Sequence, residues 1–221
     1  MLVQTKTIKK VTESGSKRHI DNVVIEKTSH IYLNDGLIAT LSHTSQNEKE
    51  LGVGYLFALN KIGFVIESVT YEDGMIRIKA SEEVTAAIHH QSTIKPNAGD
   101  IFQLTAYFQE AALLYKKTAV TESAALGKGN TLLYSAEDMT QMNAFYKVIG
   151  AFLINKNHAM TGYSLLVSAC ITAEMMAIII RCGVSLVITR TAPTHQALNM
   201  AGEHGVSIVG FARGRKYNWY Y

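Results

Sequence analysis

The sequence predicts an α/β fold in which parallel βαβ units form the carboxyl-terminal half and a smaller, strand-rich α+β unit precedes them. Three observations lead to this prediction. Hydrophobic residues make up 48% of the 221 residues and charged residues 18%, which is the composition of a globular protein with a sizeable core. Hairpin signals are concentrated before residue 80. Beyond residue 160, short β-branched runs alternate with helical patterns, as in parallel βαβ proteins.

The first elements are strands and one helix. Residues 1–20 are polar and basic, with a turn expected at 14–16, and apolar residues at period-2 spacing predict a strand over 21–33. The Asx-Gly motif at 34–36 separates this strand from the apolar run 37–41 and is a strong hairpin signal. We expect Asn47 to cap a helix whose apolar face carries Leu51, Tyr55, Leu56 and Leu59.

Two further strands, 64–69 and 75–78, flank an Asp-Gly turn at 73–74. The periodic pattern then lapses, and Pro96, Asn97 and Gly99 indicate a loop. We place the domain junction there, with a small amino-terminal domain over residues 1–98 and an α/β domain over 99–221.

The carboxyl-terminal half follows a regular order. We expect a helix over 101–115, a strand over 130–134 and an amphipathic helix whose apolar residues run from Met142 to Leu153. A strand at 163–167 precedes a mostly apolar helix at 171–182, which Gly183 ends. A strand at 184–188, a helix from Pro193 in its first turn to about 204, and a strand at 206–211 complete the pattern.

Composition also excludes some classes of protein. The formal charge of +3 is too small for a typical duplex-binding protein, so we expect no nucleic-acid partner. The longest apolar run covers only 175–180, far below the ~20 residues of a membrane helix. The first ten residues lack the apolar core of a secretory signal, and Cys170 and Cys182 are expected to lie too far apart for a disulfide. We therefore expect a cytoplasmic protein.

Ligands of open parallel sheets collect beyond the carboxyl ends of the strands. Here that rule indicates residues 189–191 and the basic loop 210–216, which contains three cations and two glycines. Arginine is suited to bidentate binding of phosphate, and glycine lets backbone amides approach a ligand. The alternative for this loop is a solvated basic tail.

Other candidate residues have simpler interpretations. Cys170 is expected to begin a buried helix and could act as a nucleophile at the helix N-terminus, where thiolates are favoured, although a lone cysteine on an apolar helix more often serves packing. The pair His89 and His90 lacks other ligand residues at a recognised spacing, so a surface pair is the better interpretation and no metal site is predicted.

Several segments of the chain match one known pattern. They include Leu33 to Gly36 and Glu50 to Leu56 in the first half, and Glu137-Asp138, Asn143-Ala144 and Lys147 to Gly150 in the middle. They continue through Ser168 with Glu174-Met175, Thr189 to Thr194, Gln196-Ala197, and Gly205 to Arg213 with Asn218 and Tyr220. In order and spacing over nearly the whole chain, these segments resemble the FdhD/NarQ family of formate dehydrogenase accessory, sulfur-carrier proteins.

The resemblance implies a cytidine-deaminase-like carboxyl-terminal domain and a homodimer. It also implies a role in activating formate dehydrogenase, a molybdenum or tungsten oxidoreductase, with sulfur taken from a cysteine desulfurase. The implied ligand is the bis-molybdopterin guanine dinucleotide cofactor (Mo-bis-MGD). The residues expected to bind it are Thr191, Phe211, Ala212, Arg213, Gly214, Arg215 and Lys216.

Departures from the family pattern concern its sulfur chemistry. The family's C-G-x-C-G loop corresponds to about residues 86–100, which contain no cysteine. The T-G-G-x-H motif is Thr118 to Glu122, the G-R-H motif is Thr140 to Met142, and the Gly-Arg of S-G-R is Ala169-Cys170. These changes leave three hypotheses open: a cofactor-handling protein that need not transfer sulfur itself, a divergent enzyme that uses Cys170, and a non-catalytic interaction subunit.

Overall fold

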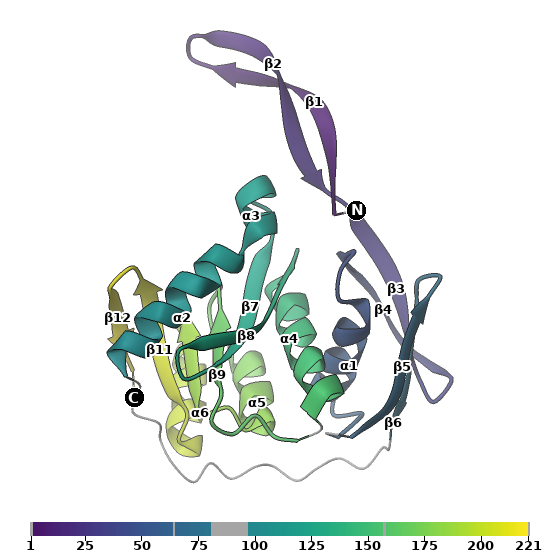
Figure 1. Ribbon diagram of the computed structural model, residues 1–221, viewed down its shortest axis with the longest axis vertical. Helices are drawn as coiled ribbons and strands as arrows, with labels where there is room; N and C mark the ends of the chain where they lie inside the picture. The colour runs from purple at the N-terminus through teal and green to yellow at the C-terminus, as the bar shows by residue number, and fades with distance from the viewer. Residues whose placement is uncertain (1, 64, 81–96, 157, 221) are drawn as a thin grey trace.

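A computed structural model describes residues 2–63, 65–80, 97–156 and 158–220. The described chain forms three sheets, of two, four and six strands. Figure 1 shows the six-stranded sheet with helices on both sides, the four-stranded sheet at the far side of those helices, and the two-stranded sheet extending away from the body. The α/β class predicted from the sequence is confirmed.

The two-stranded sheet is a long hairpin formed by β1 (Val3–Thr12) and β2 (Gly15–Val24), which pair antiparallel over their full length. Gly15 has a φ of 132° at the turn, a conformation that glycine adopts without steric cost. At its base, the backbone N–H of Ile25 donates a hydrogen bond to the carbonyl oxygen of Leu2 over 2.9 Å. The predicted strand 21–33 is therefore wrong as one element, because the chain leaves the hairpin at residue 24 and enters a different sheet.

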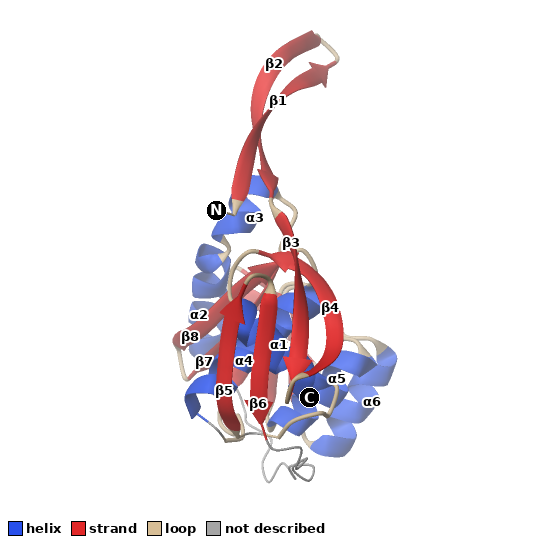
Figure 2. Cartoon of the chain, turned by 90° about the vertical axis from the view of Figure 1, so that its right-hand side faces the viewer, coloured by secondary structure: helices blue, strands red, loops and turns tan. Residues whose placement is uncertain are grey.

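The four-stranded sheet has the order β4-β3-β6-β5, and Figure 2 shows it covering α1 and α4. Its elements, with the helix that follows β4, are β3 (Glu26–Leu33), β4 (Gly36–Thr44), α1 (Glu48–Ala58), β5 (Ile66–Glu72) and β6 (Met75–Ala80). Asn34 and Asp35 both have positive φ, as a two-residue hairpin turn requires. The predicted hairpins at 34–36 and 73–74 are confirmed.

The six-stranded sheet has the order β12-β11-β10-β9-β7-β8. Its strands are β7 (Glu122–Lys128), β8 (Thr131–Asp138), β9 (Ser164–Val167), β10 (Leu186–Thr189), β11 (Ser207–Arg213) and β12 (Lys216–Trp219). The three strands β9, β10 and β11 are parallel, as predicted, whereas β7, β8 and β12 run antiparallel to their neighbours.

Helices cover both faces of this sheet. The helices of this half of the chain are α2 (Ala98–Ala111), α3 (Leu113–Thr118), α4 (Gln141–Lys156), α5 (Ala173–Cys182) and α6 (His195–His204), of which the short α3 extends beyond the sheet toward β2. Successive strand residues alternate between two cores, since Leu166 packs with α2 on one face while Leu165 and Val167 face α4 and α5 on the other. The larger core continues through α1 into the four-stranded sheet and so contains residues from both sides of position 98. The predicted domain division at that position stays a prediction.

Some predicted elements differ from the structure. The predicted helix 101–115 is two helices, because Ala112 has a non-helical ψ of 64° between them. The predicted loop around Asn97 and Gly99 is the start of α2, where the Asn97 side chain accepts a hydrogen bond from the N–H of Gly99. Pro96 lies outside the described residues. The strand β7 was missed, because its sequence ESAALGK contains no β-branched residue.

Helix ends account for the other differences. Asn47 does precede α1, but it has a left-handed φ of 58° and its side chain makes no capping bond. Leu59 is the C-cap residue and is 44% exposed, so it is not on the buried face. Thr194 caps α6, which places Pro193 before the helix rather than in its first turn. No helix in the described part of the chain is both long and apolar enough to cross a membrane.

Candidate functional site

The site lies at the carboxyl edge of the six-stranded sheet. The parallel strands β9, β10 and β11 end at this edge, where Ser168 follows β9, Arg190 follows β10 and Arg213 is the last residue of β11. Because β7 is antiparallel to β9, its first residue Glu122 lies at the same edge. Strand topology therefore brings together residues that are up to 91 positions apart in the sequence.

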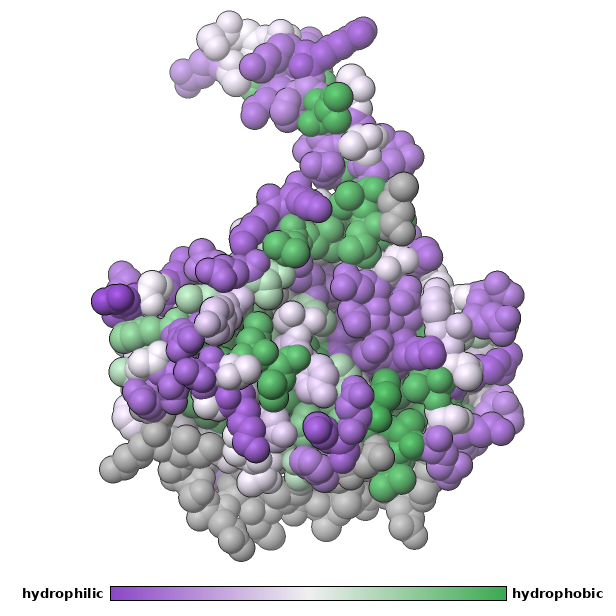
Figure 3. Space-filling view, in the orientation of Figure 1, coloured by the Kyte–Doolittle hydropathy of each residue, from purple (hydrophilic) through white to green (hydrophobic). Residues whose placement is uncertain are grey.

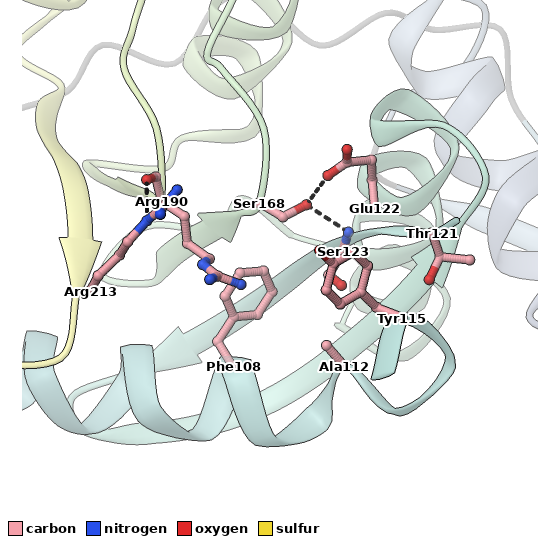
Figure 4. A pocket seen from close by; sticks show the side chains of 9 residues that line it. All are labelled: Phe108, Ala112, Tyr115, Thr121, Glu122, Ser123, Ser168, Arg190 and Arg213. Atoms are coloured by element: carbon pink, nitrogen blue, oxygen red, sulfur yellow. Dashed lines mark hydrogen bonds between the residues drawn. The ribbon is translucent and has the colours of Figure 1, made fainter. Parts of the chain in front are cut away.

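A cavity of about 260 Å³ opens between this edge and the break between α2 and α3. Figure 4 shows Arg190 and Arg213 on one side, Glu122 and Ser168 on the other, and Phe108 below them. The lining residues are Phe108, Ala112, Tyr115, Thr121, Glu122, Ser123, Ser168, Arg190 and Arg213. We refer to this cavity as the edge pocket.

Ser168 is the centre of a hydrogen-bond network on the acidic side of the edge pocket. Its hydroxyl oxygen accepts a hydrogen bond from the backbone N–H of Ser123 at 2.8 Å and lies 2.5 Å from Oε2 of Glu122. It also lies 3.0 Å from Oε1 of Gln141. The single hydroxyl proton can be donated to one of these two acceptors at a time, and the shorter distance favours the carboxylate of Glu122.

Gln141 holds the two strand ends together from the first turn of α4. Its Oε1 accepts a hydrogen bond from the N–H of Ala169 at 2.9 Å, and its Nε2 donates to the carbonyl oxygen of Ser123 at 3.1 Å. The sequence resemblance led us to expect the family's His and Arg at these two positions, where this chain has Glu122 and Gln141. Their side chains are a carboxylate and a neutral amide, so neither adds positive charge to this side of the edge pocket.

On the basic side of the edge pocket, hydrogen bonds to the backbone that follows β10 hold Arg190 and Arg213 in position. The fully buried Thr189 donates its hydroxyl proton to the carbonyl oxygen of Ala169 at 2.7 Å and accepts from the N–H of Thr191 at 3.1 Å. Nε of Arg213 donates to the carbonyl oxygen of Arg190 at 3.2 Å. This bond joins the ends of two strands and places two guanidinium groups beside one cavity, an arrangement suited to an anionic ligand.

A β-bulge determines where the residues before Arg213 point. The pairing of β11 with β12 shifts register between Gly210 and Arg213, and Phe211 has a φ of 53°, which is unusual for a bulky residue. A Cβ atom at Gly210 would come within 2.7 Å of the Tyr220 ring and 3.0 Å of the Thr191 carbonyl oxygen. The bulge leaves Phe211 45% exposed and buries Ala212 in the smaller core.

The predicted basic loop 210–216 is therefore a β-hairpin rather than a loop, because β11 continues to Arg213 and β12 begins at Lys216. Gly214 has a φ of 59° at the turn, and Arg215 and Lys216 are exposed there. Of the seven residues predicted to bind a cofactor, Arg213 lines the edge pocket. Thr191 is linked to this region through its carbonyl oxygen, which accepts a hydrogen bond from the N–H of Phe211 at 2.7 Å.

Four residues that line the edge pocket were not among the predicted site residues, namely Phe108, Tyr115, Glu122 and Arg190. Arg190 lies within residues 189–191, which were predicted as a ligand site by the strand-end rule, the rule that ligands bind beyond the carboxyl ends of parallel strands. Phe108 and Tyr115 come from α2 and α3 and reach the edge only because the helix breaks at Ala112, a break that no glycine or proline signals.

Cys170 is exposed and lies on the segment that follows β9, two residues after Ser168. It does not begin a buried helix as expected, because α5 starts at Ala173 with Thr172 as its N-cap. Cys182 is fully buried, and burial raises the pKa of its thiol to about 12. Both cysteines are free.

No cluster of three or more His, Cys, Asp or Glu side chains that could hold a metal ion occurs among the described residues. His89 and His90, which the sequence analysis interpreted as a surface pair, lie outside those residues.

A buried polar cluster lies behind the edge pocket. Nζ of Lys147 lies 2.5 Å from Oδ2 of Asp138, and both side chains are fully buried. The same ammonium group donates to the hydroxyl of Thr44 at 2.8 Å, and Asp138 accepts from the N–H of Thr44 at 3.2 Å and from Nδ2 of Asn143 at 3.1 Å. Burial lowers the pKa of Lys147, and the nearby carboxylate of Asp138 opposes that shift.

Glu137, next to Asp138, fixes the helix that contributes Tyr115 to the edge pocket. Its carboxylate accepts hydrogen bonds from the N–H groups of Leu114 and Tyr115, each at 2.7 Å, and from the hydroxyl of Thr121 at 3.0 Å. The Glu-Asp pair at the end of β8 thus serves two regions, since one acid holds α3 and the other neutralises Lys147.

These features define an α/β protein with an arginine-lined pocket at the carboxyl edge of a mixed sheet. The model of the FdhD/NarQ family matches residues 64–221. The chain therefore belongs to the FdhD/NarQ family, as its sequence motifs predicted.

Individual relatives agree with this assignment. The sulfur carrier protein FdhD of Shouchella clausii is 36% identical over 141 residues, which are 64% of this chain and 52% of that protein. The sulfur carrier protein FdhD of Listeria innocua is 25% identical, with 94% of this chain and 93% of that protein aligned.

A solved structure from Desulfotalea psychrophila, described as that of a formate dehydrogenase accessory protein, covers 100% of this chain and 97% of its own with a TM-score of 0.89. At 21% identity, this likeness shows the shared fold.

Proposed function

We propose that this protein is an FdhD-type accessory factor in the maturation of formate dehydrogenase, a molybdenum or tungsten oxidoreductase. In this role it binds an anionic ligand of the molybdopterin guanine dinucleotide type, such as Mo-bis-MGD. The observation that carries the proposal is the placement of Arg190 and Arg213 at one pocket on the carboxyl edge of parallel strands. Open sheets bind nucleotides at such edges.

The size and chemistry of the edge pocket fit one end of such a ligand. A cavity of about 260 Å³ is below the ~300–1,000 Å³ of sites that enclose a drug-sized molecule. It therefore accommodates a phosphate pair or a single ring system rather than a whole dinucleotide. The exposed Phe211 and the cations Arg215 and Lys216 lie beyond it on the same hairpin and are placed to contact the remainder.

Guanosine diphosphate tests this assignment, since it carries a guanine and two phosphates. Titration calorimetry should show binding to the wild-type chain, and Arg190→Ala or Arg213→Ala should weaken it by about tenfold or more, the loss expected for a charge-assisted hydrogen bond of ~1.5–3 kcal/mol. Arg77→Ala is the matched control, because it removes an arginine that does not line the edge pocket. Arg77 lies on the four-stranded sheet, with its Cζ 4.6 Å from the centre of the Tyr32 ring.

Comparison of Arg213→Ala with Arg215→Ala separates the edge pocket from the exposed turn. An effect of Arg215→Ala alone would move the site to the turn. Absence of any nucleotide binding by the wild-type protein would contradict the proposal and favour the hypothesis of a non-catalytic interaction subunit.

We further propose that ligand binding is retained while the family's sulfur relay is not. Residues 86–100, where the family motif has its cysteines, contain none, and persulfide chemistry requires a thiolate. Incubation with a cysteine desulfurase and cysteine should leave the mass of this chain unchanged. A mass gain of one sulfur that disappears in Cys170→Ser would contradict this proposal and support the alternative of a divergent enzyme that uses the exposed Cys170.

The remaining expectations from the family are also proposals. They are a cytidine-deaminase-like topology of the carboxyl-terminal half, a homodimer and a cytoplasmic location. The mixed six-stranded sheet with helices on both faces is compatible with the first, and sedimentation of the purified chain tests the second.

A further inference from the structure

The hairpin β1–β2 extends from the body as an isolated ribbon (Figure 1). Apart from Val3 and Val24 at its base, every residue of the two strands is exposed. A two-stranded hairpin that buries no hydrophobic face is marginally stable in water. An exposed ribbon of this length is therefore a candidate interaction surface.

The hairpin carries the net charge of the whole chain. Residues 3–24 contain five cations and two acids, a net charge of +3, which equals the net charge of the 221-residue chain. Subtracting them from the chain's 21 basic and 18 acidic residues leaves 16 of each elsewhere. The cations are Lys6, Lys9, Lys10, Lys17 and Arg18.

Four of these cations form two like-charge pairs near the tip. Lys9 lies directly opposite Arg18, and Lys10 lies directly opposite Lys17. Like charges in this position destabilise an antiparallel pair. Because successive residues point to opposite faces, one pair lies on each face of the ribbon, so both faces are cationic at the expense of the hairpin's own stability.

Apolar side chains accompany the cations. Val11 is 70% exposed and Ile20 is 68% exposed, and both lie within two residues of the paired cations. At the base, a groove of about 360 Å³ is lined by Leu2 and Val3 together with Leu113, which is 62% exposed. Figure 3 shows this apolar surface below the mainly hydrophilic hairpin.

The groove and the edge pocket are on neighbouring sides of α3. Leu113 and Leu114 line the groove, whereas Tyr115 and the preceding Ala112 line the edge pocket. A macromolecule held by the hairpin and the groove would therefore be adjacent to the edge pocket.

From these observations we propose that the hairpin β1–β2, together with the groove at its base, is a docking arm for a partner protein whose surface combines acidic and apolar side chains. A second copy of this chain fits less well, because its hairpin is equally cationic and its remainder is neutral. A nucleic acid fits less well, since residues 3–24 include no Phe, Tyr or Trp for base stacking and expose valine and isoleucine instead. This inference does not rest on the proposed function of the edge pocket.

The double variant Lys9→Glu with Lys10→Glu tests the docking arm without breaking the hairpin. Each new glutamate faces a cation on β2, so both like-charge pairs become attractive pairs. Amide hydrogen exchange within residues 3–24 should become slower than in the wild-type chain. Binding to an acidic partner should become weaker at the same time, whereas a purely structural role for these lysines predicts no loss of binding.

Fluorescence anisotropy with a labelled peptide of alternating glutamate and valine provides the binding measurement. At about 0.15 M salt, the full wild-type chain should bind this peptide, and the double variant should bind it about tenfold more weakly or worse. Val11→Ser with Ile20→Ser should also weaken binding, because the proposed interface uses both kinds of contact. The matched control is Lys61→Glu with Lys79→Glu, which makes the same change in net charge at exposed positions of the body and should leave binding unchanged.

Three results would overturn the proposal. One is equal peptide binding by the wild-type chain and the Lys9→Glu, Lys10→Glu variant, and another is no peptide binding by either. The third is tighter binding of duplex DNA, of phosphatidylglycerol vesicles or of a second copy of the chain, measured at the same salt concentration, than of the peptide.

Discussion

Lys147 and Asp138 form an ion pair in the interior, where both side chains are fully buried and 2.5 Å apart. Burying two charges is costly, and such a pair contributes little net stability compared with an apolar pair of the same shape. Removing only one of the two side chains lowers stability much more, because the remaining charge stays buried without a partner. The pair joins α4 to β8 and, through Thr44, to β4, so it fixes the position of elements behind the edge pocket.

Lys147→Met should therefore lower the free energy of unfolding by about 3–5 kcal/mol. Urea titration of the wild type, Lys147→Met, Asp138→Asn and the double variant gives a double-mutant cycle. We expect the double variant to be less destabilised than the sum of the single variants, because it leaves no unpaired charge. Additive losses would show that the two charges do not depend on each other.

The two cysteines should differ sharply in reactivity. Burial raises the pKa of the Cys182 thiol from its ordinary value of 9.0 to about 12, whereas Cys170 is exposed. Thiol reagents react with the thiolate, so in native protein at pH 8 they should modify Cys170 and leave Cys182 intact. Mass spectrometry of the labelled chain locates the modified residue, and Cys170→Ser should abolish native labelling.

The same shift has a consequence for stability at high pH. Between about 9 and 12 the Cys182 thiol ionises in the unfolded chain but stays protonated in the folded one, so the unfolded state binds fewer protons and stability falls as pH rises. Cys182→Ala should reduce this slope. Rapid native labelling of Cys182 at pH 8 would contradict the burial on which both expectations rest.

At the scale of elements, the contact between α1 and α4 depends on two glycines. A Cβ atom at Gly54 would overlap the backbone carbonyl group of Tyr146, and a Cβ atom at Gly150 would overlap that of Glu50. The two helices therefore approach backbone to backbone, with each glycine facing the other helix. Because the obstructing atoms belong to the main chain, the neighbouring helix cannot make room by a change of rotamer.

Gly54→Ala and Gly150→Ala should each destabilise the protein by about 1–3 kcal/mol through overpacking, even though alanine is the better helix former. Gly202→Ala in α6 is the matched control, since a Cβ atom there would meet nothing within 4 Å. That variant should be neutral or more stable by up to ~1 kcal/mol. Thermal unfolding of the three variants measures the contrast, and equal behaviour would refute close contact between α1 and α4.

Sequence periodicity predicted the elements whose environment is uniform along their length. The amphipathic pattern of α4 and the β-branched runs of β10 and β11 are direct results of burial, and both were predicted close to their observed ends. The helix break at Ala112 and the alanine-rich β7 lack a local signal, because tertiary packing determines them. The same limit applies to the edge pocket: the strand-end rule selected the two segments that contain Arg190 and Arg213, but only the antiparallel placement of β7 brings Glu122 to Ser168.

At the scale of the whole molecule, the larger core continues across the predicted domain junction. Ile31, Ile76 and Ile78 of the four-stranded sheet belong to the same buried cluster as Phe145 and Val167, and α1 connects the two regions. Separating the chain at position 98 would expose this shared apolar surface on both sides. The amino-terminal sheet and α1 thus complete the core of the carboxyl-terminal half.

We therefore expect a single cooperative unfolding transition in differential scanning calorimetry, with a calorimetric enthalpy equal to the van't Hoff enthalpy. A fragment containing residues 99–221 should be aggregation-prone or only partly folded when expressed alone, because the face of α4 that packs on α1 would be exposed to water. Coexpression with residues 1–98 should restore solubility by covering that face. Two separate transitions, together with a stably folded 99–221 fragment, would instead support two domains that fold independently, with the interface between α1 and α4 acting only as a contact between them.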